Sequence, residues 1–247
     1  MSPYYGRTTY SSIGYPRWTR GVKTLVLACV ITFGVQLIAG SSFIDHFGLT
    51  PADVLYSGHI WQLATYIFLH DTHNILHILF NMLGLWMFGS ELEQLWGTRQ
   101  FTKFFFICGI GAGILMVLLY FLSGGDSRVT TIGASGSIYG ILLAFGVLFP
   151  DRIIYYIIFP IPAKYFVMIM GGISLLMSLS STTGGGVAHT THLGGLAAGY
   201  FYLKKKPRIN LKAEIQYRFV KWRINRMRRK FDVYSGGRRD DVDRRVH

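Results

Sequence analysis

Long apolar segments alternate with short polar breaks along most of the chain. Their lengths are comparable to the ~20 residues that an α-helix needs to cross the hydrocarbon core of a bilayer. The pattern therefore predicts an all-α membrane protein, built as a bundle of six transmembrane helices. We expect these helices at Thr24–Ile44, Ile75–Ser90, Phe104–Leu122, Ile132–Phe149, Tyr165–Leu179 and Val187–Leu203.

The polar ends divide the chain into three expected parts. Residues 1–23 form a cytosolic N-terminal arm, residues 24–203 the six-helix membrane domain, and residues 204–247 a basic cytosolic tail. Apolar residues of the tail recur at spacings of three and four, which is typical of one face of an amphipathic helix on a membrane surface. These residues are Ala213, Tyr217, Val220, Ile224, Met227 and Phe231.

The charged residues agree with this division and also predict the orientation of the chain in the membrane. Only 15% of the residues are charged, against about 25% in a typical soluble domain. All of the 25 lysines and arginines except Arg128 fall on one predicted side of the membrane. Because such residues favour the cytosolic side, we expect both termini in the cytosol. The net charge of +13 is concentrated in the tail, which predicts binding to anionic lipids of the inner leaflet rather than to nucleic acid.

A serine flanked by glycines stands at the predicted outer start of the fourth helix, in Gly133-Ala134-Ser135-Gly136. The glycines leave the hydroxyl accessible, and a helix start presents backbone N–H groups that stabilise an anion. These are the features of a nucleophile beside an oxyanion hole. The alternative is ordinary helix packing, because Gly136 and Gly140 also form a small-residue motif.

A histidine in the sixth predicted helix, His192, is followed by Gly195 and Gly199. By their spacing the three residues share one helical face. This face can therefore pack closely against the glycines of the fourth helix and bring the imidazole to Ser135. Ionisable residues inside a membrane are costly and are functional candidates. The alternative is a histidine that is hydrogen-bonded to a neighbouring backbone carbonyl.

His77 and Asn81 share one face of the second predicted helix, near its outer end. Both can donate hydrogen bonds to a developing oxyanion, and the alternative is polar contact between helices. At about 1.5 Å of rise per residue, Ser135, His192 and His77 lie about 22, 18 and 21 Å from the inner boundary. The three motifs therefore share one depth in the membrane.

Together these motifs, HILFNM, GASGSIYG and AHTTHLGGLAAG, resemble those of the rhomboid proteases in order and in position, over residues 61–203. The resemblance implies an intramembrane serine endopeptidase that cleaves transmembrane segments of membrane proteins without a metal or other cofactor. It also implies a multi-pass protein of the bacterial inner (plasma) membrane.

The resemblance assigns roles to residues of this chain. It implies that Ser135 is the nucleophile, His192 its partner in a Ser–His dyad, and Tyr139 the ring that packs against this histidine. The backbone N–H of Ser135, with His77 and Asn81, resembles the oxyanion hole of the family. The glycines at 133, 136, 195 and 199 support this arrangement.

Two positions stand outside this pattern. Many rhomboid proteases have Trp-Arg in the first outer loop, where this chain has Trp61-Gln62. This departure concerns the anchoring of the loop and not the chemistry. His189 stands one turn before His192 but lacks glycines at i+3 and i+7, so we assign the base to His192.

Two other functions are compatible with some of these residues. A non-catalytic membrane protein could bind transmembrane helices with the same fold. A metal-binding protein could use the histidines and an aspartate near the outer side, although the H-E-x-x-H motif is absent. These candidate ligands are His70, Asp71, His73, His77, His189 and His192.

Overall fold

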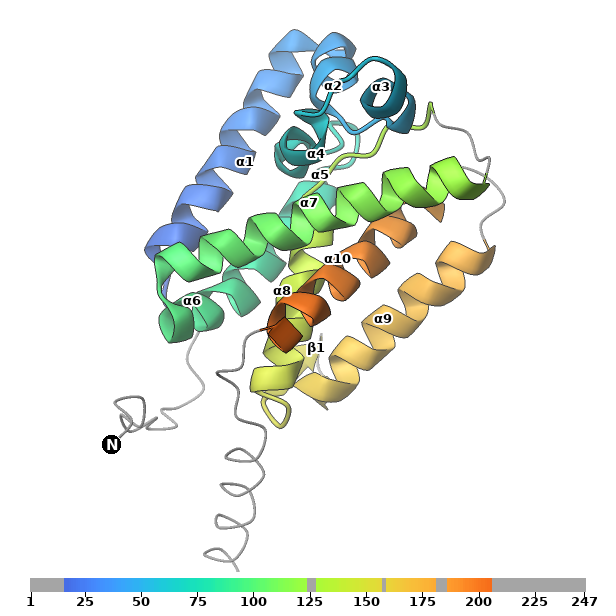
Figure 1. Ribbon diagram of the computed structural model, residues 1–247. Coiled ribbons are helices and arrows are strands. Elements are labelled where there is room, and N and C mark those ends of the chain that lie inside the picture. The colour runs from blue at the N-terminus through green and yellow to red at the C-terminus, as the bar shows by residue number, and fades with distance from the viewer. Residues whose placement is uncertain (1–15, 124–127, 157–158, 181–185, 206–247) are drawn as a thin grey trace, which may run out of the picture. The chain divides into compact units, whose positions relative to one another are not determined.

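The computed structural model describes residues 16–123, 128–156, 159–180 and 186–205, and they form mainly helices (Figure 1). The membrane domain contains the long helices in the predicted order, joined on one side by a segment of short helices and on the other by a hairpin. The elements are α1 (Arg20–Ala39), α2 (Ser41–Phe47), α3 (Pro51–Tyr56), α4 (Gln62–Thr65), η1 (Tyr66–Phe68), α5 (Ile75–Gly84), η2 (Leu85–Gly89), α6 (Ser90–Trp96), α7 (Thr98–Ser123), α8 (Ser135–Leu148), β1 (Ile153–Tyr156), β2 (Phe159–Pro162), α9 (Ala163–Ser180) and α10 (Gly186–Lys205).

Within the described residues, three helical segments are long and apolar enough to cross a membrane, namely Arg20–Ala39, Ile75–Trp96 and Thr98–Leu122. Ser135–Leu148 and Ala163–Leu179 are shorter apolar helices. Many large side chains on these helices are exposed, among them Ile38, Phe80 and Leu176. Exposed apolar surface of this extent suits a hydrocarbon environment rather than water.

The structure corrects the predicted bounds of the first three spans, and the third begins at Thr98 rather than Phe104. The first helix ends at Ala39, not Ile44, because Gly40 adopts a φ of 70° and a separate helix, α2, follows. The second predicted span continues beyond Ser90 to Trp96 through a π-helical turn at Leu85–Gly89. It stops before Gly97, whose φ of 78° is readily adopted only by glycine.

The helical content confirms the predicted all-α fold class, and a short β-hairpin adds to it between α8 and α9. Strands β1 and β2 pair antiparallel between α8 and α9, with Ile153 opposite Pro162. The prolines of this segment prevent a continuous helix, and the short extended pieces satisfy each other's backbone groups instead. The hairpin leads from the end of α8 into the start of α9.

The segment between α1 and α5 is anchored by Gln62, which is fully buried. Its Oε1 accepts a hydrogen bond from the Thr50 backbone N–H at 3.0 Å. Its Nε2 lies 3.3–3.4 Å from the backbone oxygens of Asp45 and His46 and from Oδ2 of Asp53. Gln62 thus supplies the anchoring of this loop, where many rhomboid proteases have an arginine.

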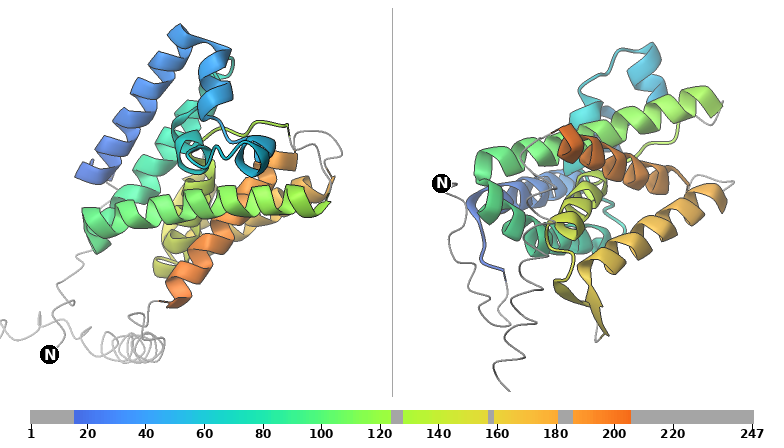
Figure 2. Two further views of the ribbon diagram at one scale, coloured as in Figure 1. Left: turned by 45° about the horizontal axis from the view of Figure 1, so that its top comes forward. Right: turned by 60° about the horizontal axis from the view of Figure 1, so that its bottom comes forward.

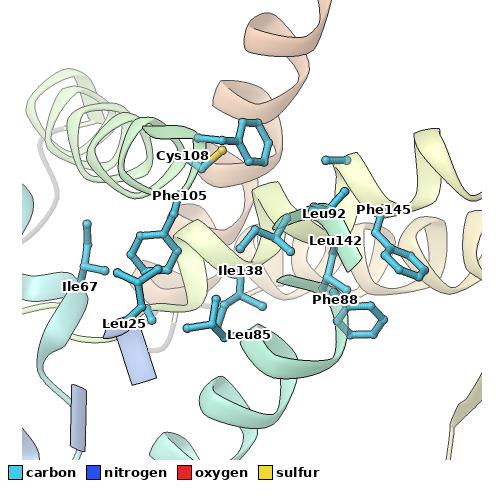
Figure 3. Packing of buried hydrophobic residues seen from close by; sticks show 14 of the residues in the cluster. Leu25, Ile67, Leu85, Phe88, Leu92, Phe105, Cys108, Ile138, Leu142 and Phe145 are labelled. Carbon is cyan, nitrogen blue, oxygen red and sulfur yellow. The ribbon is translucent and has the colours of Figure 1, made fainter. Parts of the chain in front are cut away.

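Helix α8 lies in the middle of the bundle, and the right-hand view of Figure 2 shows α7, α9 and α10 around it. Most of its residues are buried, as expected for a helix that is apolar all round. Figure 3 shows Ile138, Leu142 and Phe145 of α8 packed among side chains of η2, α6 and α7. This packing fixes the position of the helix that begins with Ser135.

Residues 206–247, which contain most of the basic tail and its predicted amphipathic helix, and residues 1–15 of the N-terminal arm lie outside the described residues. Their predicted roles therefore remain predictions.

Candidate active site

The segment before α8 places Ser135 at the first position of the helix. Gly133 has a φ of 125°, a backbone conformation that other residues rarely adopt. Its N–H donates to the Tyr66 carbonyl at 2.9 Å. Two residues earlier, Thr131 pairs with Leu49 through two backbone hydrogen bonds of 2.8 and 2.9 Å. The segment between α1 and α5 therefore fixes the residues that precede α8, and Ser135 stands where helix N–H groups lack intrahelical acceptors.

Glycines allow α8 and α10 to cross at very short distance. A Cβ on Gly195 would overlap the carbonyl oxygen of Gly136, and a Cβ on Gly199 would lie 3.2 Å from Cα of Gly140. At this separation Gly195 has no room for a larger residue, and a Cβ on Gly199 would require Gly140 to move by a few tenths of an ångström. The glycines that the sequence singled out on the two helices are thus in direct contact.

The same crossing brings His192 to Ser135. Nε2 of His192 lies 2.9 Å from Oγ of Ser135, a distance typical of a hydrogen bond. The ring of Tyr139, one turn after Ser135 on α8, stacks on the imidazole with centroids 4.1 Å apart and planes 7° from parallel. The imidazole is therefore held both by the serine and by an aromatic face.

A third hydroxyl, which the sequence did not single out, contacts both His192 and Tyr139. Ser174 of α9 is 1% exposed, and its Oγ donates to the Tyr139 hydroxyl at 3.0 Å. The same Oγ lies 3.4 Å from Nδ1 of His192. Three helices, α8, α9 and α10, therefore contribute polar side chains to one cluster.

His77 and Asn81 of α5 lie beside the start of α8. A Cβ on Gly133 would be 2.9 Å from Nε2 of His77, so this nitrogen faces the loop two residues before Ser135. Nδ1 of His77 accepts from the Asp71 N–H at 3.3 Å, which in a neutral imidazole leaves the proton on Nε2. Asn81 donates to the His77 carbonyl at 2.7 Å, and its amide has a second N–H.

His70 supports His77 from the loop before α5. It is fully buried, and its ring lies edge-on to that of His77 at 5.2 Å. Its backbone exchanges two hydrogen bonds with the side chain of Gln36 on α1, of 2.9 and 3.0 Å. Burial, and then the neighbouring imidazole of His77, lower the pKa of His70 to about 4. His70 therefore stays neutral at physiological pH.

His189 lies one turn before His192 on α10, with its ring 5.7 Å from that of His192 and nearly perpendicular to it. Among the residues that the structure describes, no group of three or more His, Cys, Asp or Glu side chains could hold a metal ion. The candidate ligands of the metal-binding alternative are thus not gathered into one such group.

The helices and the site together define a polytopic membrane protein that contains the serine–histidine contact of serine hydrolases. Residues 57–206 match the Rhomboid domain, and the chain belongs to the rhomboid family. It is therefore an integral membrane protein.

Relatives with this domain come from distant organisms. The chain is 32% identical to Rhomboid protein 1, mitochondrial, of Saccharomyces cerevisiae over 127 residues, which are 51% of this chain and 36% of the relative. It is 27% identical to the rhomboid protease GluP of Bacillus subtilis over 181 residues, 72% of this chain and 32% of the relative. Against the rhomboid protease GlpG of Haemophilus influenzae it is 25% identical over 185 residues, 74% of this chain and 90% of the relative. The chain thus spans about a third of the length of the first two.

Proposed function

We propose that this protein is an intramembrane serine endopeptidase in which Ser135 is the nucleophile and His192 the general base. The observation that carries the proposal is the 2.9 Å distance between Oγ of Ser135 and Nε2 of His192, in a chain of the rhomboid family. A base within hydrogen-bond reach activates a serine hydroxyl that is otherwise a weak nucleophile.

The reaction is peptide hydrolysis by acyl transfer. His192 accepts the Ser135 proton while Oγ attacks the scissile carbonyl, and the tetrahedral intermediate collapses as His192 donates this proton to the leaving amine. Water then attacks the acyl-enzyme, again with His192 as base, and releases Ser135. The Ser135 backbone N–H, Nε2–H of His77 and the Asn81 amide stabilise the negative charge on the carbonyl oxygen.

The substrates are transmembrane segments of other membrane proteins, which reach a dyad set among apolar helices. The distribution of lysine and arginine supports a topology with both termini in the cytosol. In that topology the basic tail faces the anionic inner leaflet. The bacterial inner membrane is the location that fits this charge pattern, although relatives of this chain include a mitochondrial protein.

The test is cleavage of a synthetic transmembrane substrate by the purified protein in detergent or vesicles. Ser135→Ala removes only the nucleophilic hydroxyl, so we expect at least a ~10³-fold loss of cleavage with unchanged thermal stability. Addition of a chelator should leave wild-type cleavage unaltered, because the dyad requires no metal.

Three results would contradict the proposal in different ways. Cleavage that survives in Ser135→Ala would exclude Ser135 as the nucleophile. Cleavage that a chelator abolishes would favour the metal-binding alternative. Substrate binding without cleavage in both proteins would favour a non-catalytic protein that binds transmembrane helices.

A further inference from the structure

Helix α9 contacts the other site helices through a hydroxyl at the depth of the proposed dyad. In the described part of its second half, residues 171–179, Ser174 is the one buried side chain, while Ile173, Leu175, Leu176 and Met177 are exposed. A buried polar side chain in an apolar helix requires a hydrogen-bonding partner. Ser174 finds two, and both belong to the site.

The two contacts of Ser174 are chemically compatible with each other. Its O–H donates to Oη of Tyr139 at 3.0 Å, so the lone pairs of Oγ remain available as acceptors. Nδ1 of His192 lies 3.4 Å from the same oxygen, within reach of a long hydrogen bond from Nδ1–H. The contact thus favours the tautomer that carries its proton on Nδ1.

That tautomer is the one which the reaction needs. An imidazole with its proton on Nδ1 has its lone pair on Nε2, the nitrogen 2.9 Å from Oγ of Ser135. In serine proteases with a triad, an aspartate fixes the same tautomer through Nδ1–H. Here a neutral hydroxyl occupies the corresponding position.

We propose that Ser174 is a positioning residue that holds His192 in its reactive tautomer and orientation. Ser174 also links His192 to Tyr139, whose ring stacks on the imidazole. Of these three residues, only Ser174 belongs to α9. His192 therefore acts as an effective base only while α9 is packed so that Ser174 contacts it. This inference rests on the proposed Ser135–His192 dyad.

The chain offers a matched control on the same helix. Ser178 lies one turn after Ser174, and its Oγ is 3.0 Å from Oγ1 of Thr190 on α10. Ser178→Ala therefore removes a hydroxyl that joins the same two helices without a contact to His192. A role limited to general packing of α9 on α10 predicts similar effects of Ser174→Ala and Ser178→Ala.

The experiment measures the rate at which a fluorophosphonate probe labels Ser135, together with kcat and KM for a synthetic transmembrane substrate. For Ser174→Ala we expect labelling and kcat to fall about tenfold with little change in KM, a loss similar to that caused by removing a group that orients a metal-bound histidine. Ser178→Ala should stay within about twofold of wild type, and Ser174→Thr, which keeps the hydroxyl, should recover most of the labelling. Thermal unfolding of each variant identifies losses that arise from instability.

The outcomes distinguish a failure of the proposed role of Ser174 from a failure of the proposed Ser135–His192 dyad. If wild-type protein labels and Ser174→Ala labels at the same rate, or if Ser178→Ala is equally slow, the role of Ser174 is overturned and the dyad stands. If wild-type protein is labelled no faster than Ser135→Ala, the proposed function itself is overturned.

Discussion

At the scale of single residues, His70 illustrates how burial makes a side chain sensitive to pH. Its pKa falls from 6.5 to about 4 in the folded protein, chiefly through burial. Between these values the unfolded chain binds a proton that the folded protein does not. Stability is therefore highest above pH ~6.5 and is lost as the pH falls towards ~4, by as much as about 3 kcal/mol from this group.

This dependence is testable by substitution. Replacement of His70 by Phe removes the titrating group, so thermal stability in detergent should fall less steeply between pH 7 and pH 4.5 than in the wild type. His73→Phe alters an exposed histidine of the same loop and serves as the control. An unchanged slope in His70→Phe would show that other groups cause the acid sensitivity.

Single residues also show what the sequence could and could not predict. Ser135, His192 and the glycines stood out because small or ionisable residues in apolar helices are conspicuous. Ser174 did not, since a serine in an apolar helix is common and only the packing of α9 makes its hydroxyl part of the site. Gln62 looked like a departure from the family pattern. Its role depends on backbone groups of Thr50 and Asp45, distant in sequence.

At the scale of elements, the crossing of α8 and α10 sets the geometry of the site. Because a Cβ at Gly195 would overlap the Gly136 carbonyl oxygen, Gly195→Ala must push the helices apart and move His192 away from Ser135. We expect a loss of about 1–3 kcal/mol in stability and at least a tenfold loss of cleavage.

A glycine of α9 provides the comparison for this prediction. A Cβ on Gly172 meets nothing within 4 Å, so Gly172→Ala should be neutral or should stabilise its helix by up to ~1 kcal/mol. Thermal unfolding and cleavage of both variants separate the effect of close packing from that of helix propensity. If Gly195→Ala cleaves at the wild-type rate, the dyad functions even when α8 and α10 lie farther apart.

The apolar pattern of the sequence predicts the long helices better than it predicts where they end and what connects them. It located the long helices, but it did not detect the end of α1 at Ala39, because Phe43 and Ile44 add apolar residues after the break. The break depends on the positive φ of Gly40. Likewise, the prolines predicted an interruption after α8, whereas the pairing of β1 with β2 depends on contacts that a local pattern does not encode.

At the scale of the whole molecule, the distribution of charge predicts how the protein lies in its membrane. The segment from residue 45 to residue 74 contains no lysine or arginine, whereas the tail from Lys204 contains most of those in the chain. Each basic residue favours the cytosolic side, so we expect Ser57 outside and Ser235 inside. The two native thiols, Cys29 and Cys108, are buried and should react slowly with an added reagent.

Single cysteines introduced at these two positions report the orientation. In sealed vesicles with the cytosolic face inward, Ser57→Cys should react with a membrane-impermeant maleimide, and Ser235→Cys should react only after detergent opens the membrane. The reverse labelling pattern would exclude the proposed topology and would place the dyad nearer the cytosolic surface. Labelling of Ser235→Cys alone in inverted vesicles would agree with the prediction, since inversion exposes only the side that carries the tail.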